Sequence, residues 1–152
     1  MRVISGKLKG KSINFIKSTT TRPLRDSVKE NIFNILAHSN IIKINVKSSK
    51  VLDLYSGVGS FGIECISREA SEVLFVERSI QTSSILKENL KNLSITEKTN
   101  LYNEKVENVI NKIKNKKFTI FFLDPPFTDF NFINNLILIK QNKLFSKNHI
   151  VI

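Results

Sequence analysis

From residue 50 to residue 152, short apolar segments alternate with longer segments whose apolar residues recur at helical spacing. Strands that alternate with helices form an open, mostly parallel sheet with helices on both faces, so the pattern predicts an α/β fold. The expected strands are VLDLY (51–55), EVLFVE (72–77), TNLYN (99–103), KFTIFFL (117–123) and HIVI (149–152), and the expected helices between them span 61–70, 80–93, 106–115 and 132–142.

The segment ahead of the first strand is expected to hold a small hairpin over 1–20 and one more helix over 22–39. Ser27 and Glu30 have the spacing of a capping box, which marks a helix N-terminus. The apolar face that this helix is expected to bury consists of Val28, Ile32, Ile35 and Leu36.

Three acidic residues stand at the ends of expected strands. Asp53 belongs to the first strand, Glu77 closes the second, and Asp124 follows the fourth. In open parallel sheets a ligand lies outside the carboxyl ends of the strands, at the point where the strand order reverses. That point lies between the first and fourth strands, so Asp53 and Asp124 are expected to be neighbours in space.

The loop after the first strand, DLYSGVGSFGIE, places Gly57, Gly59 and Gly62 in the pattern G-x-G-x-x-G, between a strand and a helix. With Glu77 about 20 residues beyond Gly57, this is the context of a dinucleotide-binding fingerprint. Asp53 at the mouth of the loop would repel a pyrophosphate and attract an ammonium group, which favours S-adenosylmethionine over a dinucleotide.

The stretch FLDPPF ends the fourth strand, because two adjacent prolines have no backbone N–H for a sheet ladder. The Asp124 carboxylate and the Pro125 carbonyl could both accept hydrogen bonds from an exocyclic amine, and Pro126 stiffens the turn. The Phe127 ring could stack on an extruded or unpaired base. We therefore interpret Asp124, Pro125, Pro126 and Phe127 as the catalytic stretch of an amino-methyltransferase.

Charge and composition suggest a polyanionic partner, most simply nucleic acid. The formal net charge is +11, and between Met1 and Arg25 there are seven Lys or Arg residues and no acid. One cysteine, no apolar run long enough for a membrane span and no signal-peptide pattern predict a cytoplasmic protein without a membrane partner. The two histidines stand apart from any Cys or acidic cluster, so no metal site is expected. We expect a monomer.

The sequence resembles the RsmD-type 16S rRNA guanine-N2 methyltransferases of bacteria. The resemblance covers almost the whole chain and is carried by MRVISGKLKGKSI, TRPLRDSVKENIFNIL, VLDLYSGVGSFGIECISREASEVLFVE and FFLDPPF. It implies a Rossmann-like class I methyltransferase fold in one domain over 1–152, with a basic RNA-contacting segment (1–24) and a core (25–152). It also implies S-adenosylmethionine as methyl donor and 16S rRNA or the small ribosomal subunit as partner.

The resemblance also implies roles for individual residues. Asp53, Gly57 and Gly59 line the methionine part of the cofactor site, Glu77 holds the ribose, and Asp124 to Phe127 hold the target base. Tyr55 is a further cofactor contact in the same loop, and Glu104 is a candidate beside the adenine. The residues expected to contact RNA are Lys7, Lys9, Lys11, Arg22 and Arg25, and Arg22, Pro23 and Asp26 match the family's N-terminal motif.

The sequence departs from the family in two places, and two alternatives stay open. The segment NEKVEN after the third strand fits the adenine site poorly, and the family usually continues for about two further strands that this chain lacks. Because the D-P-P-F stretch does not distinguish bases, the first alternative is an enzyme of the same fold that methylates another amine, such as adenine N6 in DNA or RNA. The second alternative, motivated by the short C-terminus, is a non-catalytic RNA-binding remnant.

Overall fold

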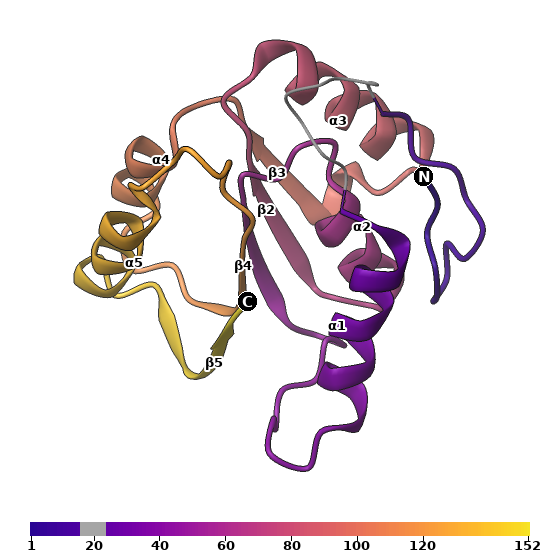
Figure 1. The fold of residues 1–152 in the computed structure, drawn as a ribbon, viewed down its shortest axis with the longest axis horizontal. Coiled ribbons are helices and arrows are strands. Elements are labelled where there is room, and N and C mark those ends of the chain that lie inside the picture. The colour runs from indigo at the N-terminus through magenta and orange to yellow at the C-terminus, as the bar shows by residue number, and fades with distance from the viewer. Residues whose placement is uncertain (16–23) are drawn as a thin grey trace.

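The computed structural model describes residues 1–15 and 24–152, and it contains one five-stranded sheet in the order β3-β2-β1-β4-β5. Every pair of neighbouring strands is parallel, so the carboxyl ends of all strands lie at one edge (Figure 1). The order reverses between β1 and β4, as the sequence predicts. The strands are β1 (Lys50–Leu54), β2 (Glu72–Val76), β3 (Thr99–Tyr102), β4 (Phe118–Leu123) and β5 (Phe145–Val151).

Helices cover both faces of the sheet, which confirms the predicted α/β architecture (Figure 1). One core joins the sheet to α1, α2 and α3, and strand residues Val51 and Phe75 point into it. The next residues along these strands, Leu52 and Val76, point into a second core with α4 and α5. The helices are α1 (Asp26–His38), α2 (Ser60–Ser67), α3 (Ile80–Asn92), α4 (Val106–Lys112) and α5 (Phe132–Gln141), with a short 3-10 helix, η1, at Thr96–Lys98.

Helix α1 differs from the prediction at its start and on its buried face. Its N-cap is Arg25, no side chain caps it, and Ser27 lies inside the first turn, so the predicted capping box is wrong. The buried face consists of Lys29, Phe33 and Leu36, whereas the apolar side chains of Val28 and Ile35 are exposed. The helix is therefore rotated so that a lysine faces the protein interior.

Strand β5 begins at Phe145, four residues before the predicted start at 149. Its residues Lys147 to His149 are exposed and give no strand pattern of their own. Pairing with β4 forms the strand: Phe145 lies opposite Phe118, and Ile150 lies opposite Ile120 after a register shift. Tertiary pairing therefore decides the extent of this strand.

Residues 1–15 form a hairpin, as predicted, with an antiparallel bridge between Arg2 and Ser12. The rest of the predicted hairpin segment, 16–20, lies outside the described residues. The Val3 N–H donates to the Lys11 carbonyl at 2.9 Å, and the Gly10 N–H donates to the Val3 carbonyl at 2.9 Å. The side chains of Val3 and Ile13 are buried against the α1–α3 face of the sheet. Within the described ranges, no helix has the length and apolar character that crossing a membrane requires.

Candidate active site

The three acidic residues singled out in the sequence meet at the carboxyl edge of the sheet. Asp53 lies near the end of β1, between Phe75 of β2 and Phe122 of β4. Burial raises the pKa of Asp53 to about 8, the charges of Asp124 and Glu77 add to this effect, and the Gly62 N–H opposes it. The predicted proximity of Asp53 to Asp124 across the β1–β4 pair is therefore present.

Asp53 is almost fully buried, and its two carboxyl oxygens differ. Oδ2 accepts a hydrogen bond from the Gly62 N–H of α2 at 3.0 Å. Oδ1 is buried and has no hydrogen-bond partner among the described residues. A buried polar atom without a partner is costly, so Oδ1 marks a position where a ligand could donate a hydrogen bond.

The glycine loop is built around the Glu77 carboxylate. Gly57 has φ of +55° and donates its N–H to Glu77 Oε2 at 2.9 Å. The Ser79 N–H donates to Oε1 at 2.8 Å. A Cβ on Gly57 would meet no atom within 4 Å, so backbone conformation rather than space selects glycine there. At Gly62, in contrast, a Cβ would collide with the Phe75 ring, so this glycine permits close packing of helix on sheet.

Asn103, which the sequence interpretation did not single out, contacts the backbone of Glu77. Its Nδ2 donates to the Glu77 backbone carbonyl at 2.8 Å. The sequence-based candidate, Glu104, instead pairs both carboxylate oxygens with Lys112 Nζ at 2.6 Å. Its position in the sequence could have indicated it, because Asn103 immediately follows the last residue of β3, at the carboxyl edge of the sheet. A hollow of about 360 Å³ between α3 and β3 is lined in part by Asn103, Ile80 and Leu101, and none of the three acids lines it.

Tyr55 follows β1, with φ of +59°, but its side chain does not join the glycine loop. It packs against the core on the α4–α5 face, and its hydroxyl oxygen accepts a hydrogen bond from Asn135 Nδ2 of α5 at 2.8 Å. Burial raises the pKa of Tyr55 to about 12, and the charge of Asp129 adds to the effect. Its phenol ties the end of β1 to the helix that follows the D-P-P-F turn.

The D-P-P-F turn leaves its functional groups free. No described residue donates a hydrogen bond to the Asp124 carboxylate or to the Pro125 carbonyl, while the Asp129 N–H donates to the Pro126 carbonyl at 2.8 Å. Partial desolvation raises the pKa of Asp124. The Phe127 ring is 96% exposed. Asp124 therefore brings to the acidic cluster a carboxylate with no donor among the described residues, and the Pro125 carbonyl and the exposed Phe127 ring follow it in the turn.

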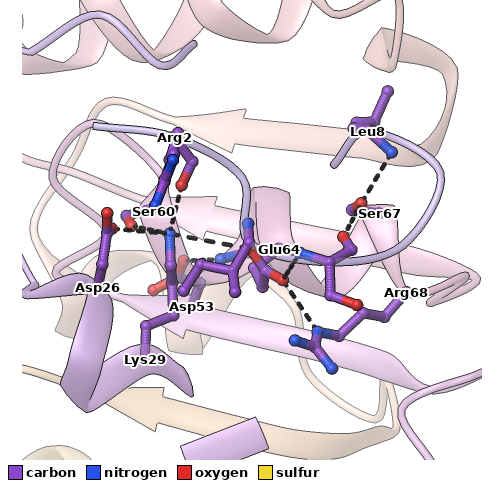
Figure 2. A network of polar contacts seen from close by, with 12 residues as sticks. Arg2, Leu8, Asp26, Lys29, Asp53, Ser60, Glu64, Ser67 and Arg68 are labelled. Atoms are coloured by element: carbon purple, nitrogen blue, oxygen red, sulfur yellow. Dashed lines mark hydrogen bonds and ion pairs between the residues drawn. The ribbon is translucent and has the colours of Figure 1, made fainter. Parts of the chain in front are cut away.

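A buried lysine lies behind the glycine loop, and the sequence did not reveal it (Figure 2). Lys29 of α1 has no exposed surface, and its Nζ donates to the Arg2 carbonyl at 3.0 Å and to Ser60 Oγ at 3.2 Å. Asp26 Oδ1 and Glu64 Oε2 each lie 3.8 Å from the same nitrogen. Burial lowers the pKa of Lys29, and the two carboxylates oppose that shift.

Glu64 of α2 connects this lysine to the N-terminal hairpin (Figure 2). Its oxygens accept hydrogen bonds from the Ile4 N–H at 2.8 Å and the Ser5 N–H at 2.9 Å. The Arg68 Nε lies 3.0 Å from Oε1. The carboxylate is fully buried yet well paired, so it fixes the start of the chain on α2.

The residues expected to contact RNA fall into three groups. Lys7 pairs with Glu69 at 2.8 Å. Lys9, Lys11 and Arg25 are exposed and take no part in the ion pairs of the described residues. Arg22 lies outside the described residues, as does Pro23 of the N-terminal motif. Within 1–15 and 24–152, no group of three or more His, Cys, Asp or Glu side chains could hold a metal ion.

Comparison with known proteins places the chain in a family. The family model described as Conserved hypothetical protein 95 matches residues 1–152. Ribosomal RNA small subunit methyltransferase D of Haemophilus influenzae is 32% identical over 99% of this chain and 76% of its own length. YlbH of Bacillus subtilis is 32% identical over 100% of this chain and 80% of its own length. The chain belongs to the RsmD-type methyltransferase family.

A solved structure supports the fold independently. YhhF of Escherichia coli superposes with a TM-score of 0.83 over 99% of this chain and 78% of that chain, at 24% identity. This likeness confirms the class I methyltransferase fold predicted from the resemblance.

Proposed function

We propose that this chain transfers a methyl group from S-adenosylmethionine to the exocyclic N2 amine of a guanine in 16S rRNA. The observation that carries the proposal is the convergence of Asp53, Glu77 and Asp124 at one sheet edge. No described residue donates a hydrogen bond to Asp124 or to the Pro125 carbonyl there, and the Phe127 ring is exposed. The names of the relatives, which describe methyltransferases of small-subunit rRNA, support the substrate class.

The acidic cluster suits a cationic ligand. Ionised carboxylates at this edge would repel a pyrophosphate and attract an ammonium or sulfonium group. Asp53 Oδ1, which has no partner among the described residues, is placed to accept from the ammonium group once Asp53 has ionised, and the backbone of Gly57 and Gly59 would line the methionine part. Glu77 retains acceptor capacity for ribose hydroxyls beyond its two backbone hydrogen bonds, and Asn103 lies next to it.

The D-P-P-F turn suits an amine nucleophile. S-adenosylmethionine supplies an electrophilic methyl group bound to a positively charged sulfur. The Asp124 carboxylate and the Pro125 carbonyl accept the two N–H groups of the amine, which otherwise delocalises its lone pair into the ring. The raised pKa of Asp124 helps its carboxylate to take the proton that the amine loses. Phe127 stacks on the base once it has left its helix.

The basic N-terminal segment (1–24), together with Arg25, is the part of the chain proposed to hold RNA. Lys9 and Lys11 lie in the hairpin, free of described ion pairs, and the net charge of +11 attracts phosphates over a wide surface. Lys7 is already neutralised by Glu69 and contributes less. Such a substrate implies a cytoplasmic location.

The decisive experiment is transfer of a labelled methyl group from S-adenosylmethionine to protein-free 16S rRNA and to small subunits, followed by nucleoside analysis. N2-methylguanosine is the expected product. N6-methyladenosine would assign a different target base, and a lack of transfer to both substrates by folded, cofactor-binding protein would overturn the proposal.

Cofactor binding has its own test. Because the pKa of Asp53 is about 8, this carboxyl is mostly protonated at pH 7. An ammonium group beside Oδ1 favours the ionised form, so binding of S-adenosylhomocysteine should release up to about one proton. Calorimetry in two buffers of different ionisation enthalpy measures this release, and Asp53→Asn should abolish it. Binding of NADH with no response to S-adenosylhomocysteine would contradict the assignment.

A further inference from the structure

A second aromatic ring stands in solvent next to the proposed target site. Phe130 is 80% exposed, compared with 96% for Phe127. Neither ring stacks on another aromatic side chain within the described part of the chain. An exposed phenylalanine side chain contributes little to the stability of the folded state. Two such side chains three residues apart therefore suggest a binding role.

The backbone that carries Phe130 is held in place. The Asp129 N–H donates to the Pro126 carbonyl at 2.8 Å, which closes a turn around Phe127. The Asn131 N–H donates to Asp129 Oδ1 at 2.8 Å, and α5 begins one residue later, at Phe132. Since an extended chain spans about 3.3–3.6 Å per residue, the Cα atoms of the two phenylalanines are at most about 11 Å apart.

We propose that Phe130 stacks on the unpaired nucleotide next to the target base, while Phe127 holds the target itself. The inference rests on the proposed function, because it requires an RNA substrate. Extruding one base removes a stacking partner from each of its neighbours. A ring within reach replaces that missing stacking, and it does so for any base, because every base has a π-face.

The helix after Phe130 provides a matched control for the loss of its side chain. Ile133 and Ile137 of α5 are 56% and 49% exposed, so aliphatic side chains are accessible on the helix that follows Phe130. A protein partner would use this apolar surface as a whole, whereas a nucleotide would use the ring face alone. Phe130→Ala therefore has a matched control in Ile133→Ala.

The test uses the full chain and an RNA fragment that contains the guanine methylated by the wild-type protein. Phe130→Ala should weaken RNA binding by about 5-fold to 150-fold, the range expected for removing one stacked base. Phe130→Tyr should bind like wild type, and Phe130→Leu should resemble Phe130→Ala, because leucine is apolar but has no π-face. Ile133→Ala should bind normally, and the thermal unfolding midpoint should stay unchanged in all four variants.

Abasic substitutions in the RNA identify the partner of the ring. An abasic position on one side of the target guanine should weaken wild-type binding and leave Phe130→Ala with no further loss. Equal effects of Phe130→Ala and Ile133→Ala would overturn the inference in favour of a protein-docking surface. Normal binding by Phe130→Ala, with Phe127→Ala impaired, would overturn it and leave the proposed function intact.

Discussion

The α2 side and the D-P-P-F side of the sheet edge use polar groups in opposite ways. Behind the glycine loop, Lys29 and Glu64 are buried, and each makes several polar contacts within the protein. In the turn after β4, no described residue donates a hydrogen bond to Asp124 or the Pro125 carbonyl, and Phe127 is almost fully exposed.

The difference separates residues that stabilise the fold from residues whose polar groups are available to a substrate. Polar groups that are already satisfied inside the protein hold elements together and have little left for a substrate. Free acceptors on a stiff turn cost the folded state little and keep their hydrogen-bonding capacity for a ligand. Asp53 combines both situations, because Oδ2 holds α2 while Oδ1 has no described partner. The comparison predicts that mutations on the α2 side change stability and mutations in the turn change rate.

Lys29→Met should produce the largest effect on stability, a loss of about 3–5 kcal/mol in the free energy of unfolding. The buried Glu64 carboxylate would keep only Arg68 as a cation among the described residues, and the Arg2 carbonyl and Ser60 Oγ would lose their donor. Denaturation with urea measures the loss. Lys50→Met is the matched control: Lys50 pairs with Glu72 at 3.6 Å on the surface, and its removal should cost about 0–1 kcal/mol. Equal losses of stability in both variants would contradict the stabilising role given to the buried polar groups on the α2 side.

Asp124→Ala should lower the single-turnover methylation rate by about a hundredfold or more, since one preorganised acceptor is removed. Its unfolding midpoint and its affinity for S-adenosylhomocysteine should match those of the wild type. Thr128→Ala, a change at an exposed position in the same turn, should have no effect on rate. A folded Asp124→Ala protein with the wild-type rate would refute the role given to the turn.

Asp53→Asn should change how stability depends on pH. The folded-state pKa of Asp53 is about 8 and its ordinary value is 3.8, so between these values the folded state keeps a proton that the unfolded state has released. The contribution of Asp53 to the free energy of unfolding therefore falls as pH rises from about 4 to about 8, by up to about 1.4 kcal/mol per pH unit. Urea denaturation of both proteins across this range should show the loss only with Asp53; parallel curves would contradict the raised pKa.

The smallest expected effect concerns RNA affinity. Replacing Lys9 and Lys11 with alanine should weaken binding and make the dependence of log K on log salt shallower by about 0.7 for each phosphate that is no longer neutralised. Lys7→Ala should change the slope less, because Glu69 already pairs with Lys7. Titrations at several salt concentrations measure the slopes. Identical slopes for all variants would show that the hairpin lysines do not bind phosphate.

Much of the fold was predictable because it depends on local patterns. The alternation of apolar strands with amphipathic helices indicated the parallel α/β sheet, and the order reversal brought Asp53 beside Asp124. The start of β5 was not predictable, since its exposed residues become a strand only by pairing with β4. The partners of Asn103 and Glu104 were not predictable for a similar reason: the partner of each side chain lies on another element.

By itself the sequence determined the motifs and their spacing: the glycine loop, the acids at three strand ends and the stiff D-P-P-F turn. These depend on backbone conformation and chain order, which neighbouring residues encode. Only the tertiary structure decided that α1 buries Lys29 instead of Val28 and Ile35. The physical reason is that a charge can be buried only next to opposite charges and hydrogen-bond acceptors. For Lys29 these are provided by Arg2, Ser60 and Glu64, which are distant from it in the sequence.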